Sequence, residues 1–218
     1  MNVDTGRSPV SALPDRREVI LPTGRVSYRQ AGSGPDMVFL HGLAGNSGTW
    51  MRQFEYFADQ FQITAWDAPG YGCSDTVTPE IDVYGDVLGA FTASLGIERF
   101  ILLGHSMGGV VAGNFSGRYP DRVAGLILSC THLGRNQRPS APLGAKYLAR
   151  LAQYEEMTPF EYGRARARSM TAPGCAPQIL EDFAQIAAET RKEGLEAAMR
   201  AISEADNRTP FASLDMPV

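Results

Sequence analysis

The sequence predicts an α/β fold in which mostly parallel strands alternate with helices, and three observations support this prediction. Short continuous apolar runs, typical of strands buried on both faces, recur at 37–40, 61–66, 100–103 and 123–128. Apolar residues spaced three and four apart predict helices between some of these runs, most clearly over 84–95. With 218 residues, 44% of them hydrophobic, the chain can bury such a core within one domain.

Two short strand-like runs open the ordered part of the chain. The runs 17–21 and 25–30 are separated by Pro22-Thr23-Gly24, which has the residue types of a hairpin turn. We therefore expect an antiparallel pair before the parallel strands begin. The polar residues 1–15 are expected to form a flexible leader, and 16–132 the main part of the α/β core.

The second half of the chain contains no strand-like apolar runs. Four amphipathic stretches, at 143–154, 160–170, 179–186 and 195–202, predict helices. We interpret residues 133–206 as a helical cap over the loops at the carboxyl ends of the strands, where ligands bind in such folds. The alternative is a helical packing layer with no role in access. Residues 207–218 are expected to return to the core.

Composition excludes several classes of partner. The net charge of −4 arises from interspersed charges, so neither nucleic acid nor an anionic membrane surface is expected to bind. Cys73, Cys130 and Cys175 form no CxxC pair, which predicts neither a disulfide framework nor a zinc site and favours a cytoplasmic location. No apolar stretch has the roughly 18 residues of a membrane span. No metal or organic cofactor is expected.

A reactive serine is predicted at Gly104-His105-Ser106-Met107-Gly108, which directly follows a predicted buried strand and opens a helix. This is the context of a G-x-S-x-G nucleophile elbow, in which the serine lies on a sharp turn between strand and helix. The flanking glycines relieve crowding around its strained backbone. The alternative is an ordinary Gly-Ser turn between a strand and a helix.

With three further segments, the sequence resembles the α/β-hydrolase superfamily. The matching segments are 41–45 (HGLAG), 67–75 (DAPGYGCSD), 95–97 (LGI) and 104–109 (GHSMGG), in the family's order and spacing. The resemblance is to the capped serine esterase and lactonase branch, which includes carboxylesterases, 3-oxoadipate enol-lactonases and cofactor-free haloperoxidases. It implies an α/β-hydrolase fold, a mostly parallel sheet with an N-terminal antiparallel hairpin and a helical cap.

The resemblance also implies roles for individual residues. Ser106 would be the catalytic nucleophile, and the backbone N–H groups of Leu43 and Met107 would form the oxyanion hole. Structural roles in the oxyanion loop and the elbow would fall to His41, Gly42, Gly104, His105 and Gly108. Asp67 would order the loop after its strand by accepting backbone N–H groups. Candidate pocket-lining residues are His132, Leu143 and Tyr147.

The other two members of a catalytic triad are not evident in this chain. The expected order is serine, acid, histidine, and His132 is the one histidine that follows Ser106. We therefore expect the acid, the histidine and the last two strands to follow Val218, and we expect residues 1–218 alone to be inactive. A C-terminal fragment of the same protein is then a candidate partner.

The predicted function is hydrolysis of a small apolar ester or lactone through an acyl-enzyme on Ser106. A carbon-carbon bond hydrolase or an acyltransferase of the same fold would use the same serine, and the residues do not separate these activities. The alternative to an enzyme is a non-catalytic homologue that binds a small ligand. A strained serine argues against it, because a binding protein gains nothing from such a residue.

Overall fold

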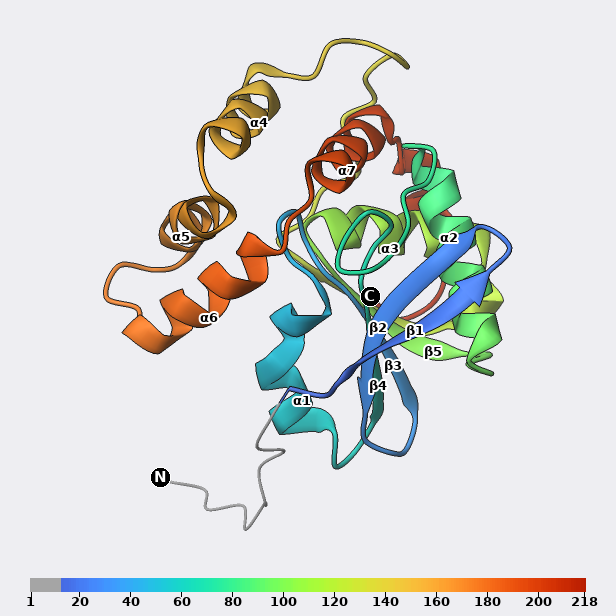
Figure 1. Ribbon diagram of the computed structural model, residues 1–218. Helices are drawn as coiled ribbons and strands as arrows, with labels where there is room; N and C mark the ends of the chain where they lie inside the picture. The colour runs from blue at the N-terminus through green and yellow to red at the C-terminus, as the bar shows by residue number, and fades with distance from the viewer. Residues whose placement is uncertain (1–12) are drawn as a thin grey trace.

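The computed structural model describes residues 13–218, and a six-stranded sheet forms its centre (Figure 1). The strand order is β1-β2-β4-β3-β5-β6. β1 pairs with β2, and β2 with β4, in antiparallel fashion, whereas the β4-β3, β3-β5 and β5-β6 pairs are parallel. The predicted hairpin and the mostly parallel sheet are therefore confirmed. The strands are β1 (Arg16–Leu21), β2 (Gly24–Ala31), β3 (Asp36–Leu40), β4 (Gln62–Trp66), β5 (Phe100–His105) and β6 (Val123–Ser129).

Helices cover both faces of the sheet because successive residues of each central strand point to opposite faces. In β3, Val38 and Leu40 join the larger core cluster beneath α2 and α3, whereas Met37 and Phe39 join a second cluster with Trp50 and Phe54. All four of these residues are buried, which explains the continuous apolar run. The helices of this part are η1 (Ser47–Trp50), α1 (Met51–Phe57), α2 (Ile81–Ser94), α3 (Met107–Arg118) and η2 (Pro120–Arg122).

Four helices follow β6 at the positions that the amphipathic stretches predict. They are α4 (Ala145–Glu156), α5 (Pro159–Met170), α6 (Pro177–Ala188) and α7 (Lys192–Glu204). Figure 1 shows α4, α5 and α6 grouped to one side, with α7 between them and α2. The α7 helix packs tightly on the core: a Cβ placed on Gly194 would lie 2.1 Å from the carbonyl oxygen of Gly70.

The helical segment 133–206 leaves and re-enters the core at one point. The backbone N–H of Asn207 donates to the carbonyl oxygen of Leu133 at 2.7 Å, so its two ends lie side by side. The amide of Asn207 is fully buried and donates to the carbonyl oxygen of Val110 in α3 at 2.7 Å. This hydrogen bond fixes the segment to the helix that begins directly after Ser106.

Residues 207–218 return to the core beside β6. A short helix, α8 (Arg208–Ala212), packs on α3, and the N–H of Leu126 in β6 donates to the carbonyl oxygen of Pro217 at 2.9 Å. Within 13–218, β6 is the edge of the sheet, and its Ile127 is 43% exposed. Residues 207–218 contain the helix α8 and no strand.

The predicted leader falls mostly on residues 1–12, which lie outside the described residues. Leu13 is partly buried against the second core cluster, and the guanidinium of Arg29 donates to the carbonyl oxygen of Pro14. Leu13 and Pro14 thus contact the body of the protein.

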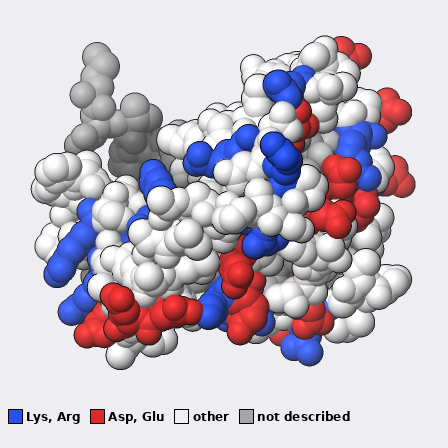
Figure 2. Space-filling model, turned by 90° about the horizontal axis from the view of Figure 1, so that it is seen from above, with Lys and Arg blue, Asp and Glu red and all other residues white. Residues whose placement is uncertain are grey.

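Surface charge is mixed on the face shown in Figure 2, where acidic and basic side chains lie interspersed. In the described part of the chain, no helix combines the length and apolarity that a membrane crossing requires. The same residues contain no group of three or more His, Cys, Asp or Glu side chains placed to hold a metal ion.

Candidate active site

Ser106 occupies the sharp turn between β5 and α3. Its φ of 52° and ψ of −114° place it outside the regions that side-chain-bearing residues normally adopt. Two hydrogen bonds hold this conformation: the N–H of Ser106 donates to the carbonyl oxygen of Ser129 at 2.9 Å, and the hydroxyl of Thr131 donates to the Ser106 carbonyl oxygen at 2.7 Å. The serine therefore lies partly buried at the carboxyl end of a central strand.

The two elbow glycines are required by close backbone contacts. A Cβ on Gly104 would lie 2.4 Å from the carbonyl oxygen of Gly108, and a Cβ on Gly108 would lie 2.1 Å from that of Leu40. Neither site has room for a methyl group, because Gly104 packs against the start of α3 and Gly108 packs against the end of β3. The G-x-S-x-G spacing thus follows from sterics at both glycines.

The loop of residues 41–45 lies beside the serine. A Cβ on Gly42 would lie 3.1 Å from the Cβ of Ser106, so Gly42 permits this close approach. Among the described residues, the N–H groups of Leu43 and Met107 donate to no protein acceptor. These two free donors next to Ser106 are what an oxyanion hole requires.

His41 orders this loop from within the core. Its ring is fully buried, and Nε2 accepts a hydrogen bond from the N–H of Ala68 at 3.0 Å. Nδ1 must then carry the proton, which it donates to the carbonyl oxygen of Gly42 at 2.8 Å. Burial lowers the pKa of His41 and keeps the ring neutral. These contacts fit the predicted structural role.

Asp67 lies at the end of β4, and all of its contacts are structural. Its Oδ1 accepts the backbone N–H of Ser47 at 2.6 Å, and its Oδ2 accepts the hydroxyl of Ser27 at 2.5 Å. The Nε of Arg16 lies 3.0 Å from the same Oδ2. The buried carboxylate accepts a backbone N–H as the sequence predicts, and it also forms an ion pair with the first strand.

Neither of the other two histidines activates Ser106 in this structure. Nδ1 of His105 lies 3.4 Å from the hydroxyl of Ser129, and burial lowers the pKa of His105. His132 is exposed, and its Nδ1 accepts the N–H of Gly134 at 3.0 Å. Within residues 13–218, no histidine or carboxylate forms a hydrogen bond to the Ser106 hydroxyl.

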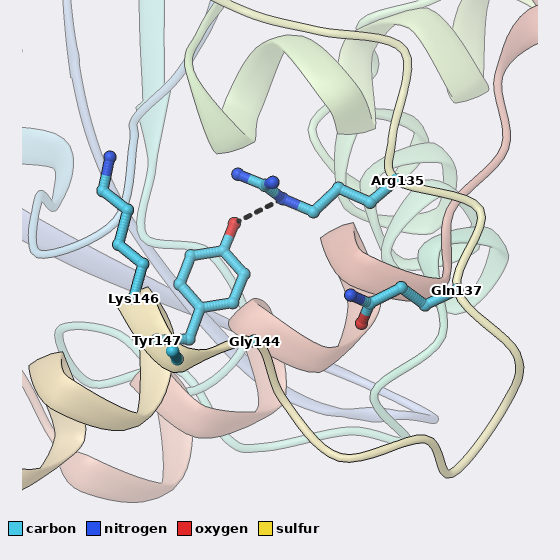
Figure 3. Close-up of a pocket in the computed structure, with 6 residues that line it drawn as sticks. Arg135, Gln137, Gly144, Lys146 and Tyr147 are labelled. Atoms are coloured by element: carbon cyan, nitrogen blue, oxygen red, sulfur yellow. Dashed lines mark hydrogen bonds between the residues drawn. The ribbon is translucent and has the colours of Figure 1, made fainter.

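The candidate pocket-lining residues do not meet at one place. A cavity of about 150 Å³ is lined by Tyr147 together with Arg135, whose Nε donates to the Tyr147 hydroxyl at 3.3 Å (Figure 3). His132 is not part of its lining, and Leu143 is buried in the core. This cavity contains none of Ser106, Leu43 and Met107 in its lining, so it is separate from the elbow.

One contact between the helical segment and the loop 41–45 was not predicted. The guanidinium of Arg150 in α4 donates from Nη2 to the carbonyl oxygen of Leu43, and from Nε to the hydroxyl of Tyr162 in α5, both at 3.3 Å. The sequence does hold a signal for it. Arg150 lies three residues after Tyr147 and four before Tyr154, and thus on the apolar face of its helix.

Comparison with known proteins identifies the class. The family model described as the alpha/beta hydrolase fold matches residues 35–184, more than half of the chain. The chain therefore belongs to the α/β-hydrolase fold family.

Individual relatives are similar to different extents. The 3-oxoadipate enol-lactonase 2 of Acinetobacter baylyi is 28% identical over 191 residues, covering 84% of this chain and 68% of that protein. An uncharacterized Mycobacterium tuberculosis protein is 38% identical over 106 residues, which span 48% of this chain and 31% of the relative's length. A solved esterase from Thermogutta terrifontis superposes with a TM-score of 0.73 and 26% identity, over 93% of this chain and 78% of that one.

Proposed function

We propose that the protein hydrolyses small ester or lactone substrates through an acyl-enzyme on Ser106. The observation that carries this proposal is the strained backbone of Ser106 beside the two free N–H groups of Leu43 and Met107. Backbone strain of this kind costs about 1–3 kcal/mol and clusters at active sites; here the hydrogen bonds to Ser129 and Thr131 maintain it. The similar enol-lactonase and esterase support the substrate class.

The proposed reaction has two steps. The Ser106 hydroxyl attacks the carbonyl carbon as a base takes its proton, and the N–H groups of Leu43 and Met107 donate to the developing oxyanion. Loss of one such donor typically costs about 3 kcal/mol of transition-state stabilisation. Collapse of the intermediate breaks the ester C–O bond, and the proton passes to the leaving oxygen. Water, deprotonated by the same base, then attacks the acyl-enzyme and releases the acid.

The base and its orienting acid are proposed to come from residues other than those that the structure describes. Both ring nitrogens of His41 are hydrogen-bonded, Nε2 to the N–H of Ala68 and Nδ1 to the carbonyl oxygen of Gly42, so neither is free to accept the proton of Ser106. His132 already accepts the N–H of Gly134 through Nδ1 and has no carboxylate partner among residues 13–218. On this proposal, residues 1–218 alone are catalytically silent.

We also propose that residues 133–206 act as a cap. Arg150 contacts the carbonyl of Leu43 directly, which supports a position over the oxyanion loop. The two ends of the segment are adjacent, because the N–H of Asn207 donates to the carbonyl oxygen of Leu133. Such adjacent ends are typical of an inserted unit. The cap would shape the substrate pocket and limit the access of water to it.

Labelling with a fluorophosphonate tests the proposal. In the whole protein, mass spectrometry should locate one adduct on Ser106; the Ser106→Ala variant should carry none, and Ser94→Ala should label like the parent. Residues 1–218 alone should stay unlabelled at the same reagent concentration. An unmodified Ser106 in the whole protein would refute the acyl-enzyme, and rapid labelling of the isolated chain would place the base within it.

A further inference from the structure

The loop that carries Leu43 contains a tight turn with an unusual residue at its third position. The N–H of Gly45 donates to the carbonyl oxygen of Gly42 at 3.0 Å, so residues 42–45 form a β-turn with Leu43 and Ala44 at its centre. Ala44 has a φ of 62°, whereas the φ of Leu43 is negative. A positive φ at the third position alone is the mark of a type II turn, in which glycine or asparagine is preferred there. An alanine at this position is strained by its own Cβ.

A type I turn of the same four residues would relieve this strain. The two turn types share the hydrogen bond from the fourth N–H to the first carbonyl, and they differ by a flip of the central peptide group, here the one that joins Leu43 to Ala44. The flip gives the third position a negative φ, which suits alanine. It also exchanges the Leu43 carbonyl oxygen for the Ala44 N–H on the side that faces α4. A contact from outside the turn must therefore hold this peptide group in its strained orientation.

The helical segment supplies that contact through Arg150 of α4. Nη2 of Arg150 donates to the Leu43 carbonyl oxygen at 3.3 Å, which requires this oxygen to point toward α4. The guanidinium is itself held in place, because its Nε donates at 3.3 Å to the hydroxyl of Tyr162, a fully buried side chain of α5. The ring of Tyr162 packs edge-on against Tyr154 of α4, with centroids 5.0 Å apart. The helices α4 and α5 thus present one fixed cation to the turn.

A second contact lies at the other end of the same peptide group. The buried Tyr71 packs edge-on against His41, with ring centroids 4.9 Å apart. Burial raises the pKa of the Tyr71 hydroxyl, and the hydrogen bond from the N–H of Ala44 opposes this rise. A protonated phenol can accept from an N–H or donate to a carbonyl, so Tyr71 suits either orientation of the peptide group. Arg150 has only donors and suits one, so the choice between the two turns depends on Arg150.

We propose that Arg150 is a positioning residue that holds the 42–45 turn in its type II form, so that docking of α4 selects the conformation of this turn. While α4 lies on the turn, the Leu43 carbonyl faces Arg150 and the Leu43 N–H is free beside Ser106. When α4 moves away, the strain at Ala44 is no longer opposed and the central peptide group flips. The link from the turn to catalysis rests on the proposed function; the two states of the turn do not.

Nuclear Overhauser effects measured by NMR in the whole protein distinguish the two turns without any turnover. In a type II turn the Hα of Leu43 lies next to the amide proton of Ala44, whereas in a type I turn the two amide protons are close. The parent should show the type II pattern, and Arg150→Met should shift it toward type I. Lys146→Met, the loss of an exposed charge on the same helix, should leave it unchanged. An unchanged type II pattern in Arg150→Met would overturn the proposal.

Ala44→Gly then separates the turn from the loss of charge. Glycine adopts a positive φ without a steric cost, so Ala44→Gly should restore the type II pattern in the Arg150→Met background. The rate constant for fluorophosphonate labelling of Ser106 in the whole protein should fall about tenfold in Arg150→Met and recover in the double variant. Equal rates in the single and double variants would assign the loss to the charge of Arg150 and refute the turn as the link.

The outcomes separate this inference from the proposed function. Loss of the type II pattern in Arg150→Met, together with an unlabelled Ser106 in the whole parent protein, would leave the two-state turn and refute the acyl-enzyme. A labelled Ser106 with the type II pattern in every variant would refute the role of Arg150 alone.

Discussion

Asp67 accepts a hydrogen bond at 2.6 Å from the backbone N–H of Ser47, the residue that opens the first helical turn after the loop 41–45. The carboxylate is fully buried and also lies 3.0 Å from Nε of Arg16. It thus joins the end of β4, the start of η1 and the first strand. The carboxylate thus fixes the start of η1, directly after the loop that carries Leu43.

Replacement of this carboxylate tests that role. Asp67→Asn removes the charge that Arg16 faces and turns one acceptor into a donor, so we expect a loss of about 3 kcal/mol in unfolding free energy. The exposed Asp75 accepts the N–H of Arg25 at 2.8 Å, and Asp75→Asn should cost under about 1 kcal/mol. Urea denaturation measures both. Equal losses would contradict the buried role of Asp67.

The elbow glycines give a second prediction, about sterics. Gly108→Ala would bring a Cβ to 2.1 Å from the carbonyl oxygen of Leu40 and should destabilise the protein by about 3 kcal/mol. A Cβ on Gly89, inside α2, would lie 3.4 Å from its nearest neighbour, a ring carbon of Phe115. Gly89→Ala should therefore stabilise the protein by about 0.5–1 kcal/mol. Thermal unfolding of the two variants should show shifts of opposite sign. A neutral Gly108→Ala would show that the elbow can relax.

Much of the fold could be predicted from the sequence because its core strands are buried on both faces. Runs such as 37–40 stay apolar throughout, and the amphipathic stretches of the second half match α4 to α7. The helix α1 was not predicted. Trp50, Phe54 and Phe57 have helical spacing, but the helix is only 7 residues long, and so short an apolar pattern is weak.

The site could be predicted only as far as its motif extends. Ser106 and the loop 41–45 come together because the carboxyl ends of neighbouring parallel strands lie at one edge of the sheet. Arg150 belongs to no motif, and its contacts with Leu43 and Tyr162 depend on how α4 packs over the core. Its position on the apolar face of α4 is the local sign of these contacts in the sequence.

The backbone of Ser106 gives a prediction about strain. At a φ of 52° and ψ of −114°, glycine is less strained than alanine, so Ser106→Gly should be about 1 kcal/mol more stable than Ser106→Ala. At Ser116, inside α3, the order should reverse by about 1 kcal/mol, because glycine disfavours a helix interior. Chemical denaturation of the four variants compares the two sites. The same order at both would show that Ser106 is unstrained in solution.

His41 should make stability depend on pH. Its pKa in the folded protein is lowered from the ordinary value of 6.5 by burial, so the unfolded chain binds a proton that the folded chain does not. The contribution of His41 to the free energy of unfolding is therefore fully present above about pH 6.5. It is lost as the pH drops below that value, by at most about 1.4 kcal/mol per pH unit.

His41→Gln isolates this contribution, because an amide can still donate to Gly42 and accept from Ala68. Unfolding free energies at pH 7.5 and 5.5 should differ less in His41→Gln than in the parent. His132→Gln, at an exposed site, should keep most of the parent's pH dependence. If His41→Gln loses as much stability on acidification as the parent, then the buried imidazole is not the group that titrates, and the neutral His41 between Ala68 and Gly42 does not govern the acid sensitivity of the loop.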